Sequence, residues 1–137
     1  MKTIVLGYDD SEASQRALER AASLAKAFGS GLIVTSVTPI MTSIGRSGGP
    51  IDPTDPPAKH AAELAHAKEY LAGQCLSADL QPAVGNPADT IVELAEQRGA
   101  DLIVVGTHGP NVLERLLGQS VSESVSHKAH CDVLIVH

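Results

Sequence analysis

Short apolar runs alternate along the chain with longer segments whose apolar residues recur at helical spacing. The runs contain few polar residues, which is typical of strands that are buried on both faces of a parallel sheet. Five strands are predicted in this way, at 3–6, 32–37, 80–84, 101–106 and 133–136. Four helices are predicted between them, at 11–28, 58–76, 87–98 and 120–129. The alternation predicts an α/β fold in one domain that spans residues 1–137.

The ends of the predicted helices carry recognisable capping residues. Ser11 is suited to cap the start of the first helix, and Gly29 is suited to end it. Asn86 followed by Pro87 is a cap with proline at the first helical position. Pro82 lies inside the third apolar run and cannot donate to a neighbouring strand, so this run is predicted to be an edge strand.

Crossover helices between buried strands predict a doubly wound parallel sheet with helices on both faces. In such sheets ligands bind beyond the carboxyl ends of the strands, where the strand order changes direction. The residues that follow each strand are therefore the first candidates for a site. They lie at 7–10, from 38 onward, at 85 and from 106 onward.

One segment, 40–57, has a different composition, with four prolines and three glycines among serine and threonine. We expect a long, flexible loop here. Loops of this length inside a compact domain are more often functional or disordered than simple connections.

The charge and the aromatic content exclude several classes of function. Sixteen acidic residues against ten Lys and Arg give a net charge of −6, which argues against a nucleic-acid partner. Only Tyr8, Phe28 and Tyr70 are aromatic, too few for a base-stacking platform. No apolar run approaches the ~18 residues of a membrane span, and the first ten residues turn acidic, unlike a signal peptide. We expect a cytoplasmic protein with no membrane partner.

The sulfur and imidazole groups show no metal-site spacing. Cys75 and Cys131 are far apart in the sequence, and we expect two buried or half-buried free thiols. His127 and His130 are three residues apart on a predicted helix, but a pair without a neighbouring carboxylate is a weak metal signal. No metal ligands are predicted.

Two features at the strand ends suggest a nucleotide site. Gly106 and Gly109 follow a buried strand, and Ser120 opens a helix after them, an arrangement that suits an anion cradle or, equally, a tight strand-to-helix turn. Asp9 stands at the tip of the first strand, where a carboxylate can accept a hydrogen bond from a ribose hydroxyl. We assign Asp9 to the site and Ser11 to the helix cap.

Four motifs also occur in order at these strand ends. They are V-L-G-Y-D-D-S at 5–11, L-I-V-V-G-T-H-G at 102–109, S-V-S-E-S-V at 120–125 and C-D-V-L-I-V at 131–136. In these motifs the chain resembles the universal stress protein family along its whole length. The resemblance implies a five-stranded parallel sheet in the order 3-2-1-4-5, like that of adenine nucleotide alpha hydrolase-like proteins. It also implies a homodimer through the C-terminal strand, and the apolar run at 133–136 suits such an edge.

The resemblance further implies a site for an adenine nucleotide, ATP or AMP, with Mg²⁺ as an optional companion ion. Asp9 would meet the ribose, and the backbone of Val37 would meet the adenine. The phosphates would lie against Gly106, Gly109, Ser120 and Val121. The predicted site is completed by Gly7, Tyr8, His108 and Gln119.

The chain departs from the family's nucleotide-binding motif at two points. Gln119 stands where the motif has its last glycine, and Gly118 lies one place earlier. The glutamine side chain either hinders the outer phosphates or donates its amide N–H groups to them. Pro110 replaces a basic residue that is common in the family. Ser120 and Glu123 also form the pattern of a capping box, which would leave Ser120 with less to offer a phosphate.

These observations predict an adenine-nucleotide-binding universal stress protein that acts as a regulatory, stress-response module. Two alternatives stay open: a nucleotide-free member that serves as a protein–protein interaction module, and a slow ATP hydrolase. Gln119 favours the nucleotide-free protein, whereas Asp9 and the paired glycines favour binding. His108 is the only acid–base group at the predicted site, and no nucleophile has a motif-placed base, so we expect no enzyme.

Overall fold

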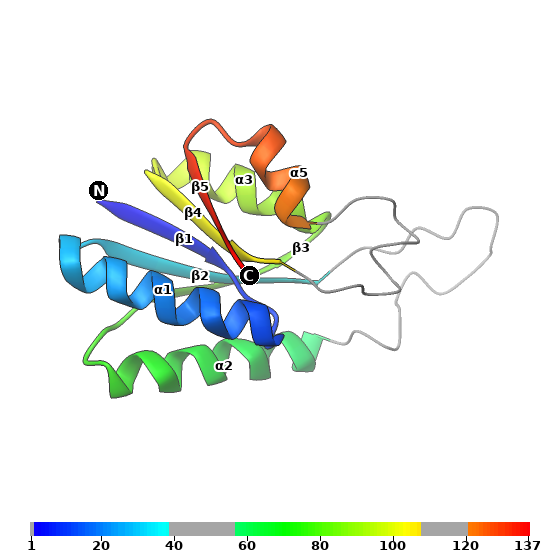
Figure 1. The fold of residues 1–137 in the computed structure, drawn as a ribbon. Helices are drawn as coiled ribbons and strands as arrows, with labels where there is room; N and C mark the ends of the chain where they lie inside the picture. The colour runs from blue at the N-terminus through cyan, green and yellow to red at the C-terminus, as the bar shows by residue number, and fades with distance from the viewer. Residues whose placement is uncertain (1, 39–56, 108–120) are drawn as a thin grey trace.

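The strands form one parallel sheet, seen in a computed structural model that describes residues 2–38, 57–107 and 121–137. Its order is β3-β2-β1-β4-β5, as expected (Figure 1). The strands are β1 (Thr3–Gly7), β2 (Gly31–Thr38), β3 (Asp79–Val84), β4 (Leu102–Gly106) and β5 (Asp132–Val136). The predicted strands are therefore confirmed, with ends that differ by at most one residue.

Helices cover both faces of this sheet. They are α1 (Glu12–Phe28), α2 (Pro57–Gly73), α3 (Pro87–Arg98) and α5 (Val121–Lys128). Figure 1 shows α1 and α2 on one face, which we call the α1/α2 face, and α3 and α5 on the other, the α3/α5 face. Successive residues of each strand pack alternately into two apolar clusters, since side chains along a strand point to opposite faces. Leu6 and Val104 lie in the α1/α2 cluster, whereas Val5 and Ile103 lie in the α3/α5 cluster.

The predicted helix caps are confirmed. The Ser11 side chain accepts a hydrogen bond from the Ser14 backbone N–H, which has no partner within the helix. Gly29 follows α1 in the left-handed conformation, with φ 64°. Asn86 caps α3 through the backbone N–H of Asp89, and proline occupies one of the first two helical positions.

Helix α2 ends earlier than expected, at Gly73 rather than at residue 76. The backbone N–H of Leu76 bonds back to the Leu71 carbonyl at 2.9 Å, and Cys75 takes a left-handed φ of 58°. This is the hydrogen bond of a Schellman C-cap, formed here without glycine at the left-handed position. Glycine-based stop signals could not reveal it.

The two cysteines are free thiols, as expected, but one of them is more accessible than predicted. Cys75 is exposed in the turn after α2, so the expectation that both are at least half-buried was wrong for this residue. Cys131 is half-buried before β5. Burial and the nearby carboxylate of Asp132 raise the pKa of its thiol.

Strands β3 and β5 form the two edges of the sheet, and Pro82 lies in β3, as its sequence predicted. Among the helices that the structure describes, none combines the length and the apolar character needed to cross a bilayer. The predicted loop at 40–57 falls, except for its last residue, outside the described residues.

Candidate nucleotide site at the carboxyl edge of the sheet

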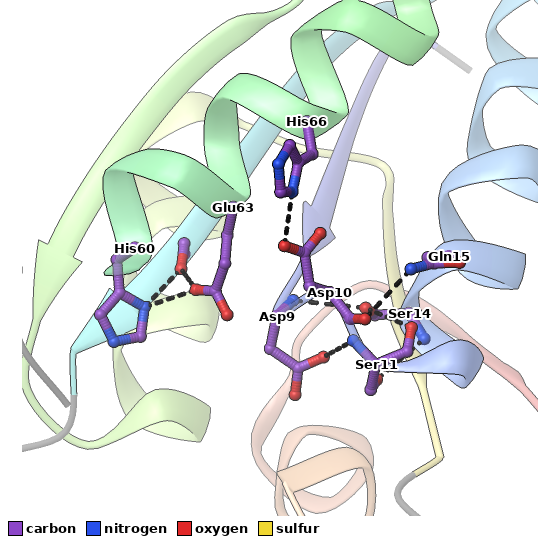
Figure 2. Close-up of polar contacts among 9 residues, drawn as sticks. Asp9, Asp10, Ser11, Ser14, Gln15, His60, Glu63 and His66 are labelled. Carbon is purple, nitrogen blue, oxygen red and sulfur yellow. Dashed lines mark hydrogen bonds and ion pairs between the residues drawn. The ribbon is translucent and has the colours of Figure 1, made fainter. Parts of the chain in front are cut away.

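The alternation along the strands assigns the predicted site residues to the two faces. Tyr8 packs into the cluster under α1 and α2, and it is only 6% exposed. Val37 packs at the border of the opposite cluster, under α3 and α5. Asp9 follows Tyr8, and its carboxylate points away from α2 (Figure 2). Asp9 and Val37 therefore share the α3/α5 face.

Two of the predicted site glycines have a packing reason of their own. A Cβ on Gly106 would lie 2.5 Å from the Ala13 carbonyl carbon and 2.7 Å from the Ser14 nitrogen, inside the backbone of α1. A Cβ on Gly7 would lie 2.8 Å from the end of the Ile91 side chain on α3. Glycine at these positions lets β4 and β1 approach their covering helices, whether or not a phosphate is bound.

The turn after β1 is built on the Asp9 carboxylate. Its Oδ1 accepts a hydrogen bond from the Ser11 backbone N–H at 3.0 Å, the geometry of an Asx-turn. The Asp9 backbone N–H in turn donates to the Ser14 hydroxyl at 3.3 Å. These bonds hold Asp9 beside the first turn of α1. A carboxylate has about four acceptor positions, so this orientation is compatible with a further bond from a hydroxyl of a ligand.

Asp10 lies on the other side of the same turn. Its backbone is left-handed, with φ 63°, which is uncommon outside glycine. Its Oδ2 lies 2.7 Å from Nδ1 of His66 on α2 (Figure 2). Burial and a hydrogen bond to the Asp10 carboxylate, together with the negative charges of Asp10 and Glu63, raise the pKa of the Tyr8 hydroxyl. Tyr8, Asp10 and His66 thus join the tip of β1 to α2.

A second polar cluster, which the sequence analysis missed, joins α2 to β2. The Ser36 hydroxyl donates to Glu63 Oε1 at 2.7 Å and lies 2.6 Å from His60 Nδ1. His60 Nδ1 is also 2.7 Å from the same Glu63 oxygen. All three residues are buried: Ser36 is 1% exposed, His60 is 6% exposed and Glu63 is 2% exposed. The i, i+3 spacing of His60 and Glu63, and a serine in an otherwise apolar strand, were the available signals.

This Ser36–His60–Glu63 cluster is structural in its geometry. A nucleophilic relay uses the two ring nitrogens of histidine for different partners, one for the hydroxyl and one for the carboxylate. Here a single ring nitrogen of His60 faces both Ser36 and Glu63. The cluster also lies on the α1/α2 face, since Ser36 precedes Val37 on β2. The hydrogen bonds of this cluster connect the first turns of α2 to the end of β2.

Several predicted site residues lie outside the described part of the chain: His108, Gly109, Gln119 and Ser120. Val121 is described, and it is the half-buried first residue of α5. Within the described residues, no three His, Cys, Asp or Glu side chains form a group that could hold a metal ion.

Both the sequence and the structure of this chain are similar to those of known proteins. A sequence profile of the universal stress protein family matches residues 1–137. The universal stress protein Rv1636 of Mycobacterium tuberculosis is 36% identical over 149 aligned residues, which cover 99% of this chain and 96% of that protein.

Solved structures give the same result. The crystal structure of a universal stress protein in complex with cAMP is 33% identical, covers 99% of this chain and 97% of its own, and superposes with a TM-score of 0.75. The universal stress protein of Archaeoglobus fulgidus in complex with dAMP superposes with a TM-score of 0.76 over 100% of this chain and 98% of its own. Its identity is 24%, and this likeness shows the fold alone.

Proposed function

This chain belongs to the universal stress protein family, and from that premise we propose that it binds an adenine nucleotide and acts as a regulatory module. The proposal rests on the direction of the Asp9 carboxylate, which points away from α2, and on the position of Val37 under α3 and α5. Extending the register of β1 and β2 by two residues brings Asp9 and Val37 to the same side of the sheet. The helix α5, whose start is predicted to meet the phosphates, covers that same face (Figure 1). Adenine, ribose and phosphate contacts can therefore follow one another along one side of the carboxyl edge.

The residues present fit an adenosine moiety. Asp9 supplies an acceptor for a ribose hydroxyl, and β2 supplies backbone groups at Val37 for the adenine edge. The related structure with cAMP, at 33% identity, supports an adenine nucleotide as the class of ligand. Within that class we propose AMP or ATP, the latter with Mg²⁺, with Gln119 deciding between them.

We propose a regulatory rather than a catalytic role for the bound nucleotide. The described serine, histidine and carboxylate that contact one another, Ser36, His60 and Glu63, are buried on the α1/α2 face. Asp9 and Val37 lie on the opposite face of the sheet, so this cluster is separated from the proposed ligand.

The direct test of the proposed site is Asp9→Ala. We expect the affinity for AMP, measured by isothermal titration calorimetry, to fall about tenfold or more, because a hydrogen bond to a charged group contributes about 1.5–3 kcal/mol. Asp79→Ala is the matched control, since this exposed carboxylate pairs with Arg98 at the opposite end of the sheet. Equal affinity of parent and Asp9→Ala would remove Asp9 from the site. A parent that binds no adenine nucleotide would favour the interaction module.

We also propose that the protein forms a homodimer through β5. This strand is one edge of the sheet, and its residues Val133, Leu134 and Ile135 are all only half-buried within one chain. An unpaired apolar edge is suited to pair with another strand. Ile135→Lys is expected to shift the sedimentation coefficient toward the monomer. Val84→Lys, on the opposite edge at a side chain that is already 68% exposed, is expected to leave it unchanged. A parent that sediments as a monomer would contradict the interface.

A further inference from the structure

Two adjacent carboxylates at the end of β1 point to opposite sides of the turn (Figure 2). Asp9 accepts from Ser11 at the start of α1, whereas Asp10 meets His66 on α2. The two residues share one peptide unit, so the backbone conformation that directs one carboxylate also sets the direction of the other.

The left-handed backbone of Asp10 makes this division possible. A residue with a Cβ is strained at φ 63° and keeps this conformation only when its surroundings hold it there. The Asp10 carboxylate is held by His66 Nδ1 at 2.7 Å and by the Tyr8 hydroxyl. The Asp10 carbonyl accepts from Gln15 Nε2 at 3.1 Å. His66 is the member of this set that comes from α2.

We propose that His66 is a positioning residue for the nucleotide site: by holding Asp10, it orients the Asp9 carboxylate toward the ribose. This inference rests on the proposed function. The His66 and Asp10 side chains are 61% and 28% exposed, and such pairs contribute little to stability. The loss of their contact should therefore change ligand affinity without unfolding the protein.

The first experiment compares variants of the full chain by titration with AMP. We expect His66→Ala to weaken binding about threefold to thirtyfold, the range for residues that modulate a site without touching its ligand. His66→Asn should restore the affinity, because the asparagine amide can donate from the place of Nδ1. The matched control is His130→Ala, which removes an 81% exposed histidine that meets Glu96. It should change nothing. Unchanged affinity in His66→Ala would overturn the proposal.

A double-mutant cycle separates positioning from a general structural effect. If His66 acts through Asp9, then adding His66→Ala to Asp9→Ala should change the affinity by less than about twofold. The same fold-loss in both backgrounds would show that His66 acts by another route, and the proposal would be wrong.

A second measurement needs no nucleotide. The Ser11 amide donates to Asp9, so its ¹H–¹⁵N signal reports the carboxylate's orientation in the ligand-free protein. We expect this signal to shift in His66→Ala and to return in His66→Asn. A stationary signal overturns the positioning role even where AMP binds. A signal that shifts in a protein that binds no adenine nucleotide supports the orientation of Asp9 by His66 and refutes the proposed ligand instead.

Discussion

Gly106→Ala is expected to lower the free energy of unfolding by about 3 kcal/mol, at the upper end of the range for overpacked sites. The added Cβ would meet the Ala13 carbonyl oxygen at 2.6 Å and the Ser14 nitrogen at 2.7 Å. These are backbone atoms of α1, so no side chain can rotate away, and the helix must move off β4. Urea denaturation followed by circular dichroism measures the change.

Gly73→Ala is the matched control for this substitution. Gly73 is the last residue of α2, and an added Cβ there would meet nothing within 4 Å. Alanine in a helix is more stable than glycine by roughly 0.5–1 kcal/mol, so this variant should be neutral or slightly stabilised. If the two alanine variants unfold at the same urea concentration, the close approach of β4 to α1 is not what requires glycine at 106.

His60→Ala is expected to lower the free energy of unfolding by about 3 kcal/mol, at the upper end of the range for a buried polar group that loses its hydrogen-bond partner. The Glu63 carboxylate is 2% exposed, and it would keep only part of its hydrogen bonding, through the Ser36 hydroxyl. Thermal and urea unfolding of parent and variant give the difference directly.

The matched variant removes the whole Ser36–His60–Glu63 cluster, as Ser36→Ala, His60→Leu and Glu63→Leu together. It leaves none of the three groups without a partner from the cluster, and replacing all partners of a buried hydrogen bond by apolar groups of similar shape can be nearly neutral or stabilising. We expect its stability to lie closer to the parent than that of His60→Ala. A triple variant less stable than His60→Ala would contradict this expectation. It would show that the cluster makes a net contribution to stability, and that its hydrogen bonds do more than compensate for the burial of three polar groups.

The sheet could be predicted from the sequence because strands that are buried on both faces are apolar at nearly every position. Runs such as Leu102–Gly106 are apolar throughout, which is the pattern of a central strand in a parallel sheet. The helix caps at Ser11 and Asn86 were also predictable, since capping is a local interaction. The end of α2 was not, because Cys75 takes a conformation that its residue type does not announce.

The contacts around the candidate site could be predicted only in part, because they depend on the backbone conformation and on residues far apart in the sequence. Asp9 and Asp10 are the same residue type in adjacent positions, and only the left-handed backbone of Asp10 separates their partners. His60 and His66 belong to the alanine-rich helix α2, and their partners are distant in the sequence. His60 contacts Ser36, 24 positions away, and His66 contacts Asp10, 56 positions away. The sequence predicted a role for Gly106 in a phosphate cradle. The close packing of Gly106 against the α1 backbone, which leaves no room for a Cβ, could be found only from the structure.

The alternation along β1 and β2 also limits how this chain can change in length. Side chains repeat every two residues along a strand, so an insertion or deletion of one residue exchanges the faces of everything that follows within it. One residue added between Leu6 and Tyr8 would turn the carboxylate of the proposed site toward α2 and its histidines, and Tyr8 toward the ligand face. The same change within β2 before Ser36 would bring Ser36 out of its buried cluster. Related chains should therefore vary in length in the segment after β2 or in the turns at the amino edge, and keep a fixed count of residues through the ends of both strands.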